Sequence, residues 1–180
     1  MGRTKQLLQL GDKAVISHCI DAMLDSGISD CVVVVGAREN GVTWLLRGLP
    51  VTIAVNDIPG SDMAESVRAG LKLISASSSG VLIGLSDHPL VSPETMKTLI
   101  REHAAFPGSI IIPVYLRKRG HPSLFPVPAL RKIFFGGNLR DIVRQDPARV
   151  RLVDVPDEGV VLDMDTPGDY EAILEHYRSR

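Results

Sequence analysis

Val-Leu-Ile-Gly-Leu-Ser-Asp-His-Pro-Leu-Val-Ser-Pro, residues 81–93, is the stretch that decides the fold. Its apolar start is typical of a parallel strand that is covered on both faces. The apolar run stops at Ser86 and Asp87, so a carboxylate follows the carboxyl end of this strand. Ligands bind at that edge of open α/β sheets, which makes Asp87 a candidate for holding a divalent cation against phosphate oxygens. The alternative is that Asp87 only forms a turn before Pro89.

A helix is predicted to begin directly after this loop, because Ser92 is a good N-cap and Pro93 suits a first helical turn. On both sides of the central stretch, segments with strand and helix periods alternate. Strands are predicted at 31–35, 51–55, 110–114, 151–155 and 160–162, and helices at 13–23, 40–49, 63–75, 94–104, 130–135, 139–143 and from 167 onward. Pro113 predicts that its strand bends or lies at an edge. The alternation predicts an α/β fold with a mostly parallel sheet.

Size and composition limit the possible functions. A chain of 180 residues is predicted to form one domain, residues 1–180, with a proper core. The net charge of −1 disfavours nucleic acid and anionic membrane as partners, and the low aromatic content of 4% disfavours base-stacking platforms. Cys19 and Cys31 are spaced neither as a redox pair nor as a zinc framework, so we expect buried thiols. No stretch reads as a secretory signal, which makes the cytoplasm the expected location.

Polar residues follow several predicted strands. Asn56, Asp87 and the pair Asp163 and Asp165 all fall at predicted carboxyl ends. Strand-end acids that share one sheet edge could converge on Mg²⁺, which favours one or two carboxylates plus substrate phosphates. The alternative for Asp163 and Asp165 is that they are caps and turn formers at a strand-to-helix junction.

Basic and imidazole side chains add further candidates. Arg3 and Lys5 could neutralise a triphosphate, and the alternative is an ordinary solvated terminus. His121, between Gly120 and a proline, could contact a substrate or only stabilise its own turn. His103 sits in a predicted helix and is expected to face solvent. The sequence has neither a Ser-His-Asp grouping nor a GxxxxGK[ST] phosphate loop.

Several motifs occur in one order across the whole chain. They are Met-Gly-Arg-Thr-Lys-Gln-Leu-Leu at 1–8, Asn56, Ser-Val-Arg-Ala-Gly at 66–70, Ser-Asp-His-Pro-Leu-Val at 86–91, Gly-His-Pro at 120–122 and Asp-Met-Asp-Thr-Pro-Gly-Asp-Tyr at 163–170. In this combination the chain resembles the MobA-like nucleotidyltransferases. The Asp-x-Asp-Thr-Pro form is similar to the molybdenum cofactor cytidylyltransferase branch, whereas the guanylyl branch tends to carry asparagines there.

The resemblance implies a Rossmann-like, three-layer domain that transfers CMP from MgCTP to the terminal phosphate of molybdopterin and releases pyrophosphate. A GTP-using relative would belong to the guanylyl branch. The family's site residues carry over as Lys5 and Asp87 for catalysis, Arg3, Lys5, Asn56 and Ser66 for the nucleotide, Gly120 and His121 for the acceptor, and Asp87 and Asp165 for Mg²⁺. These roles fit phosphoryl-type transfer, which relies on positioning and on cations more than on a protein nucleophile.

The chain departs from the family in some places. Family members have a strand and a loop reading roughly Leu-Ala-Ala-Gly-x-Ser-x-Arg directly before the Met-Gly that is residues 1–2 here. The absent strand would lie between the predicted strands 31–35 and 81–85, so we expect the chain as given to be incomplete. Asp62 and Ser86 replace glycines that the family usually has, and His88 stands where glutamine is frequent.

Two functions follow from these observations. The first is an enzyme, a CTP-dependent cytidylyltransferase that modifies molybdopterin. The second is a non-catalytic module that holds the molybdenum cofactor or docks on a molybdenum hydroxylase. The retained Lys5, Asp87 and Asp165 favour the enzyme, whereas the missing loop favours the module.

Overall fold

The central stretch forms a strand, a loop and a helix, as the sequence predicts. In the computed structural model, which describes residues 4–179, strand β5 is Gly80–Ile83 and helix α4 is Pro93–Ala105. The Oγ of Ser92 accepts a hydrogen bond of 3.2 Å from the backbone N–H of Thr95, so the predicted N-cap is present. The loop between β5 and α4, which carries Asp87, therefore connects a sheet edge to a well-capped helix.

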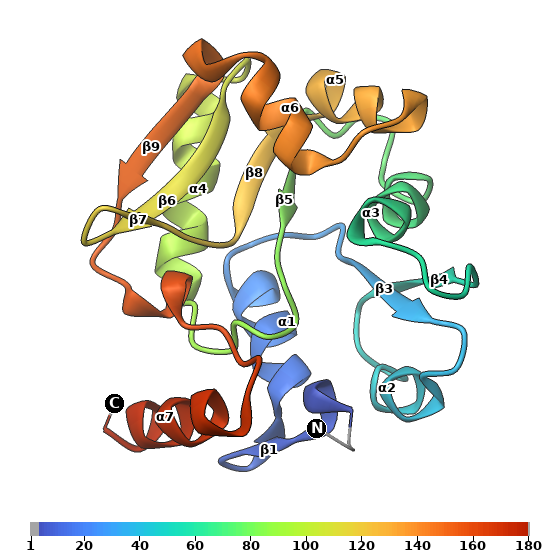
Figure 1. The fold of residues 1–180 in the computed structure, drawn as a ribbon, viewed down its shortest axis with the longest axis vertical. Helices are drawn as coiled ribbons and strands as arrows, with labels where there is room; N and C mark the ends of the chain where they lie inside the picture. The colour runs from blue at the N-terminus through green and yellow to red at the C-terminus, as the bar shows by residue number, and fades with distance from the viewer. Residues whose placement is uncertain (1–3, 180) are drawn as a thin grey trace.

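The remaining elements alternate along the chain (Figure 1). The other strands are β1 (Gln9–Leu10), β2 (Lys13–Ala14), β3 (Val32–Gly36), β4 (Thr52–Asn56), β6 (Ile110–Tyr115), β7 (Lys118–Arg119), β8 (Ser123–Pro126) and β9 (Val150–Asp154). The other α-helices are α1 (Val15–Asp25), α2 (Asn40–Leu45), α3 (Met63–Leu71), α5 (Val127–Leu130), α6 (Leu139–Gln145) and α7 (Pro167–Arg178). Short 3-10 helices are η1 (Lys5–Leu7), η2 (Arg131–Phe135), η3 (Pro147–Arg149) and η4 (Glu158–Val161).

Two separate sheets make up the central layer. Strands β3 and β4 pair in parallel, while the larger sheet has the order β5-β8-β6-β7, with β9 parallel to β6. Because β8 is antiparallel to both β5 and β6, strands β5, β6 and β9 run in one direction. Figure 1 shows β3 and β5 both running downward in that view. The predicted α/β architecture with a mostly parallel core is confirmed.

Helices cover both faces of the central layer, as the alternating side chains of β5 demonstrate. Val81 and Ile83 pack in a core cluster with α3, whereas Leu82 packs on the other face with residues of α1 and α4. Strand β3 follows the same rule, since Val35 packs with α1 and Val34 contacts Gly70 of α3. The fold is therefore a three-layer α/β/α arrangement in which α1 and α3 hold the two sheets together.

Two local predictions are wrong, and one of the two alternatives for Pro113 is wrong. Strand β6 lies inside its sheet between β8 and β9, so Pro113 does not mark an edge. Proline has no N–H to donate, but this position in the sheet uses only the acceptor. The Pro113 carbonyl accepts a hydrogen bond of 2.8 Å from Gly120 N–H. Residues 160–162 form no strand, because η4 occupies Glu158–Val161. His103 is buried at 7% exposure, since it packs beneath Gly80 beside Ser79.

The cap of the last helix is confirmed. The Oγ1 of Thr166 accepts a hydrogen bond from the backbone N–H of Asp169, whose carboxylate in turn accepts one from Thr166 N–H. This reciprocal capping fixes the strand-to-helix junction that carries Asp165. Within residues 4–179, the search for helices both long and apolar enough to cross a bilayer finds none.

Burial of His103 predicts a pH-dependent stability. Burial lowers the pKa of this imidazole from its ordinary value, so the folded state binds fewer protons than the unfolded state. Stability from this group is therefore complete above the unfolded pKa of about 6.5 and declines as the pH falls below it. We expect the melting temperature to drop between pH 7.5 and 5.5, and to drop less in a His103→Gln variant. An equal pH dependence in both proteins would contradict this assignment.

Candidate active site

Three segments that are distant in sequence bring one lysine between two carboxylates. Lys5 comes from η1, Asp87 follows β5 and Asp165 precedes α7. The Lys5 Nζ lies 2.7 Å from Asp87 Oδ2 and 3.0 Å from Asp165 Oδ1. The two carboxylates therefore share one sheet edge, as their positions after predicted strands suggested. Because both oxygens contact the same nitrogen, the distance between Asp87 Oδ2 and Asp165 Oδ1 cannot exceed the sum of those two contact distances.

Asp87 has an unused binding atom. Its side chain is 19% exposed, and its Oδ1 is buried without a hydrogen-bond partner in the described structure. A buried carboxylate oxygen without a partner is costly, so such an atom marks a place for a bound group. The Asp165 side chain is 67% exposed and contacts the same lysine, Lys5, at 3.0 Å.

The donor set suits a hard divalent cation that substrate oxygens help to bind. Asp87 and Asp165 offer carboxylate oxygens, and Mg²⁺ typically takes one or two carboxylates together with phosphate oxygens. Among residues 4–179, no group of three or more His, Cys, Asp or Glu side chains is placed to hold a metal. The arrangement therefore fits a cation held partly by a phosphorylated substrate, rather than a cage made by protein alone.

Lys5 is a cation at neutral pH. Its partial burial by itself lowers the pKa, but the hydrogen bonds and charges of Asp87 and Asp165 outweigh this effect and leave the pKa raised. The ammonium group thus supplies a permanent positive charge next to the unused oxygen of Asp87. Such a charge can bind phosphate oxygens as readily as carboxylates. Arg3, the other predicted phosphate ligand, lies outside the described residues.

Asn56 and Ser66 form a second polar group at the ends of β4 and α3. The Asn56 amide donates hydrogen bonds of 2.8 Å to Ser61 Oγ and 3.0 Å to Ser66 Oγ, and its Oδ1 accepts one from Ile58 N–H. Asn56 is 9% exposed, so it organises the loop between β4 and α3. The two residues are brought together, and they line the same cavity as Ser86, beside Asp87.

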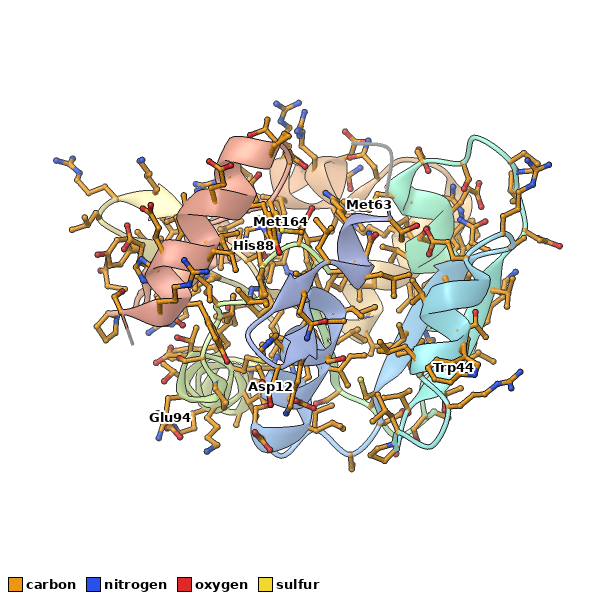
Figure 2. The ribbon with its side chains drawn as sticks, turned by 90° about the horizontal axis from the view of Figure 1, so that it is seen from below. Asp12, Trp44, Met63, His88, Glu94 and Met164 are labelled. Atoms are coloured by element: carbon orange, nitrogen blue, oxygen red, sulfur yellow. The ribbon has the colours of Figure 1, made fainter. Side chains whose placement is uncertain are left out.

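His121 lies beside His88, the residue that follows Asp87 in the chain. Its ring centroid is 5.4 Å from that of His88, and His121 Nδ1 is buried with no hydrogen-bond partner in the described chain. Burial first, and then the neighbouring His88, lower the pKa of His121, so this imidazole is neutral at pH 7. Figure 2 shows His88 in the interior beside Met164, with Glu94 at the periphery. A neutral ring with a free nitrogen can accept or donate one hydrogen bond to a ligand.

Gly120 lets the segment that carries His121 pack closely against η4. A Cβ atom on Gly120 would lie 2.3 Å from the carbonyl oxygen of Val160, so no larger residue fits without a shift. The next backbone N–H, that of His121, donates a 2.8 Å hydrogen bond to the same oxygen. Gly120 thus allows the close approach that positions His121. The role of Gly120 in the site is to position this neighbour.

Two further residues were not singled out by the sequence. Gln6 Nε2 donates a 3.2 Å hydrogen bond to Ser86 Oγ and so ties η1 to the end of β5. Asp157 is buried and accepts hydrogen bonds from the backbone and hydroxyl of Ser92, from Thr95 Oγ1 and from Gly159 N–H. Its position in an Asp-Glu-Gly turn gave no signal of this role, because such turns are usually at the surface.

Comparison with protein families finds one matching model. The model is described as the MobA-like NTP transferase domain, and it matches residues 1–150.

Two curated proteins show different extents of similarity. The nicotine blue oxidoreductase of Paenarthrobacter nicotinovorans is 30% identical over 173 residues, which is 90% of this chain and 83% of that protein. The 2-C-methyl-D-erythritol 4-phosphate cytidylyltransferase of Sodalis glossinidius is 33% identical over 124 residues, which is 65% of this chain and 50% of that protein.

Solved structures share the fold over nearly the whole chain. Rv0371c from Mycobacterium tuberculosis H37Rv has a TM-score of 0.83 and 26% identity, and the match covers 97% of this chain and 91% of that one. A manganese complex of Rv0371c has a TM-score of 0.78 at 24% identity over 97% of this chain and 93% of that one. A nucleotidyl transferase from Methanothermobacter thermautotroptrophicus has a TM-score of 0.83 at 24% identity, over 98% of this chain and 86% of that one.

Proposed function

Because the chain belongs to the MobA-like NTP transferase domain family and is a nucleotidyltransferase, we propose that it transfers CMP from MgCTP to a molybdopterin-type cofactor. The observation that carries this proposal is the convergence of Lys5, Asp87 and Asp165 at one sheet edge. These groups suit a triphosphate and its cation, since one ammonium group and two carboxylates can bind phosphate oxygens and a divalent ion. Burial raises the pKa of the nearest cysteine, Cys19, to about 12, so its thiol stays protonated.

In the proposed complex, Asp87 and Asp165 hold Mg²⁺ and Lys5 moves from the carboxylates to the triphosphate. The bound cation would offset negative charge on the phosphates. A manganese complex of Rv0371c is consistent with a divalent ion in this fold. Asn56, at the end of β4, and Ser66, in α3, are proposed to bind the nucleoside, and their mutual hydrogen bond orders both side chains. Arg3 is proposed to add charge on the phosphate side.

The reaction needs no protein base. An oxygen of the acceptor's terminal phosphate, already ionised at pH 7, attacks the α-phosphorus of CTP and forms a new P–O bond. The bond from the α-phosphorus to the bridging oxygen breaks, and pyrophosphate leaves with its electron pair. Lys5 stabilises the charge that builds up on this oxygen. His121 would donate or accept one hydrogen bond to orient the acceptor phosphate, while Gly120 keeps the ring in place.

Two observations support CTP as the substrate. The Asp-x-Asp-Thr-Pro form at 163–167 resembles that of the cytidylyl branch, and a curated cytidylyltransferase is 33% identical over 124 residues. We expect the chain, supplied with MgCl₂ and molybdopterin, to release pyrophosphate from CTP at least about tenfold faster than from GTP, a difference of about 1.4 kcal/mol. Labelled CMP should appear on the acceptor in equal amount. A preference for GTP would assign the chain to guanylyl transfer instead.

Two other functions have an observation behind them. Nicotine blue oxidoreductase is a relative by sequence, so the same protein should be assayed for a redox reaction with nicotine blue. Asp62 stands where the family usually has glycine, and an added acid beside the nucleotide loop would weaken CTP binding, which favours a module that binds molybdopterin, or docks on a molybdenum hydroxylase, without turnover. Turnover of nicotine blue without pyrophosphate release would support the oxidoreductase. Stoichiometric binding of molybdopterin with no product from CTP would support the module.

A further inference from the structure

The two carboxylate oxygens of Asp87 have different surroundings. Oδ2 accepts a hydrogen bond of 2.7 Å from Lys5 Nζ. Oδ1 is buried and has no hydrogen-bond partner within residues 4–179, and Nε2 of His88 lies 4.0 Å from it. The unused oxygen of Asp87 therefore has an imidazole nitrogen as its neighbour.

The orientation of the His88 ring decides what this nitrogen can do. The His88 side chain is 8% exposed, and its Nδ1 lies 3.5 Å from the carbonyl oxygen of Gly159. A carbonyl oxygen can only accept a hydrogen bond, so the contact favours the ring proton on Nδ1. In the neutral ring the lone pair is then on Nε2, the atom next to Asp87. Nε2 is therefore the nitrogen that can bind a metal ion.

The carbonyl that orients the ring is itself fixed. It belongs to η4, where Gly159 N–H donates a hydrogen bond of 3.0 Å to Asp157 Oδ1. Histidine ligands of metal ions usually donate their second ring N–H to a carbonyl or carboxylate oxygen, which sets the tautomer and the direction of the ring. His88 has this kind of support.

The gap between the two atoms suits a ligand that both of them bind. At 4.0 Å, His88 Nε2 and Asp87 Oδ1 are too far apart for a direct hydrogen bond. The gap is shorter than two bonds to one metal ion laid end to end, because bonds from Zn²⁺ to nitrogen or oxygen are about 2.0–2.2 Å each. One cation can therefore contact both atoms.

We propose that His88 Nε2 binds the active-site cation together with Asp87 Oδ1, and that this imidazole makes the site prefer a first-row transition-metal ion over Mg²⁺. The proposal rests on the proposed function only in taking Asp87 as a ligand of the cation. Asp165 and phosphate oxygens supply further ligands, so the protein needs no closed cage of its own.

The chemistry of the ligands sets the preference. Mg²⁺ is a hard ion that takes oxygen ligands, whereas an imidazole nitrogen suits first-row transition metals. The family frequently has glutamine at this position, and that side chain has no imidazole nitrogen. Mn²⁺ is the weakest binder in the transition-metal order, so a preference for Mn²⁺ over Mg²⁺ is a demanding test.

Pulsed electron paramagnetic resonance of Mn²⁺ added to the whole chain tests the bond directly. Inorganic triphosphate supplies phosphate oxygens in this experiment, because it contains no nitrogen. A nitrogen bound to Mn²⁺ modulates the electron spin echo, whereas oxygen ligands do not. We expect this modulation in the wild type, its loss in His88→Gln, and its retention in His176→Gln, a matched change on α7 at a side chain that contacts Glu158.

Two further measurements keep the test independent of the folding of one variant. Labelling the wild type with ¹⁵N-histidine is expected to change the modulation frequency, which identifies an imidazole without any substitution. Melting scans show whether His88→Gln is folded. In the folded variant, titration with each ion is expected to show at least about a tenfold loss of Mn²⁺ affinity and less than about a twofold change for Mg²⁺.

Three results would overturn the proposal. They are the absence of saturable Mn²⁺ binding, bound Mn²⁺ without nitrogen modulation in the wild type, and modulation that persists in His88→Gln but disappears in His121→Gln. The last would assign the imidazole ligand to His121. Pyrophosphate release from CTP decides the proposed function separately. A failed release assay beside an intact nitrogen signal would reject the transfer reaction and keep the metal site.

Discussion

Replacing Asp87 by asparagine is expected to lower the rate of CMP transfer about 10³-fold. The substitution keeps the size of the side chain but removes the charge that holds Lys5 at 2.7 Å and replaces one carboxylate oxygen with an amide nitrogen, which cannot bind a cation. Removal of a single preorganised charge contact in a transfer site typically costs about 10²–10³ in rate. Here the same carboxylate is proposed to bind the cation and to position Lys5, so the upper end of that range is expected.

The measurement is pyrophosphate release at saturating CTP, repeated over a series of Mg²⁺ concentrations. Asp154→Asn is the matched control, because Asp154 is an exposed acid that also stands at the end of a strand, β9. We expect that variant to keep the wild-type rate within about twofold. If Asp87→Asn turned over normally at the Mg²⁺ concentration that suits the wild type, Asp87 would not be a metal ligand.

The sequence predicted the convergence of Asp87 and Asp165 for a simple reason. Asp87 follows a buried strand whose period and end signals are strong, and ligands bind at that edge of a sheet. The strand predicted before Asp165 is η4 instead, and Asp165 reaches the same edge from the capped junction before α7. Capping patterns were equally informative, since Ser92 and Thr166 form the caps that their neighbours indicate. Helix caps depend only on neighbouring residues in the chain, so they can be predicted from a single sequence.

Features that depend on distant neighbours were not predictable in the same way. His103 was expected in solvent because its helix looks half-polar, but Ser79 and Gly80 of a separate segment cover it. Pro113 predicted an edge because its missing donor is a local property, whereas the sheet order that places β6 inside is a global one. The sequence likewise contained no sign that Asp157 is buried, because its partners Ser92 and Thr95 lie more than sixty positions away.

Asp157 links the two halves of the candidate site. Its carboxylate holds the start of α4, which directly follows the Asp87 loop, and also orders η4 through Gly159. Gly159 fits so closely against Leu90 that a Cβ atom would lie 2.3 Å from the Leu90 carbonyl oxygen. The same short helix accepts the hydrogen bond from His121 N–H through Val160. The buried carboxylate of Asp157 therefore holds in place both the loop that carries Asp87 and the segment that carries His121.

Asp157→Ala is accordingly expected to destabilise the protein by about 3 kcal/mol, because several buried donors lose their acceptor together. For a chain of this size the loss corresponds to a fall of about 6–12 °C in melting temperature. Chemical denaturation of the wild type, Asp157→Ala and the exposed control Asp154→Ala gives the three free energies of unfolding. The control is expected to change by less than about 0.5 kcal/mol. A cost below about 1 kcal/mol for Asp157→Ala would mean that Ser92, Thr95 and Gly159 find other acceptors, and that η4 is held by its packing against Leu90 instead.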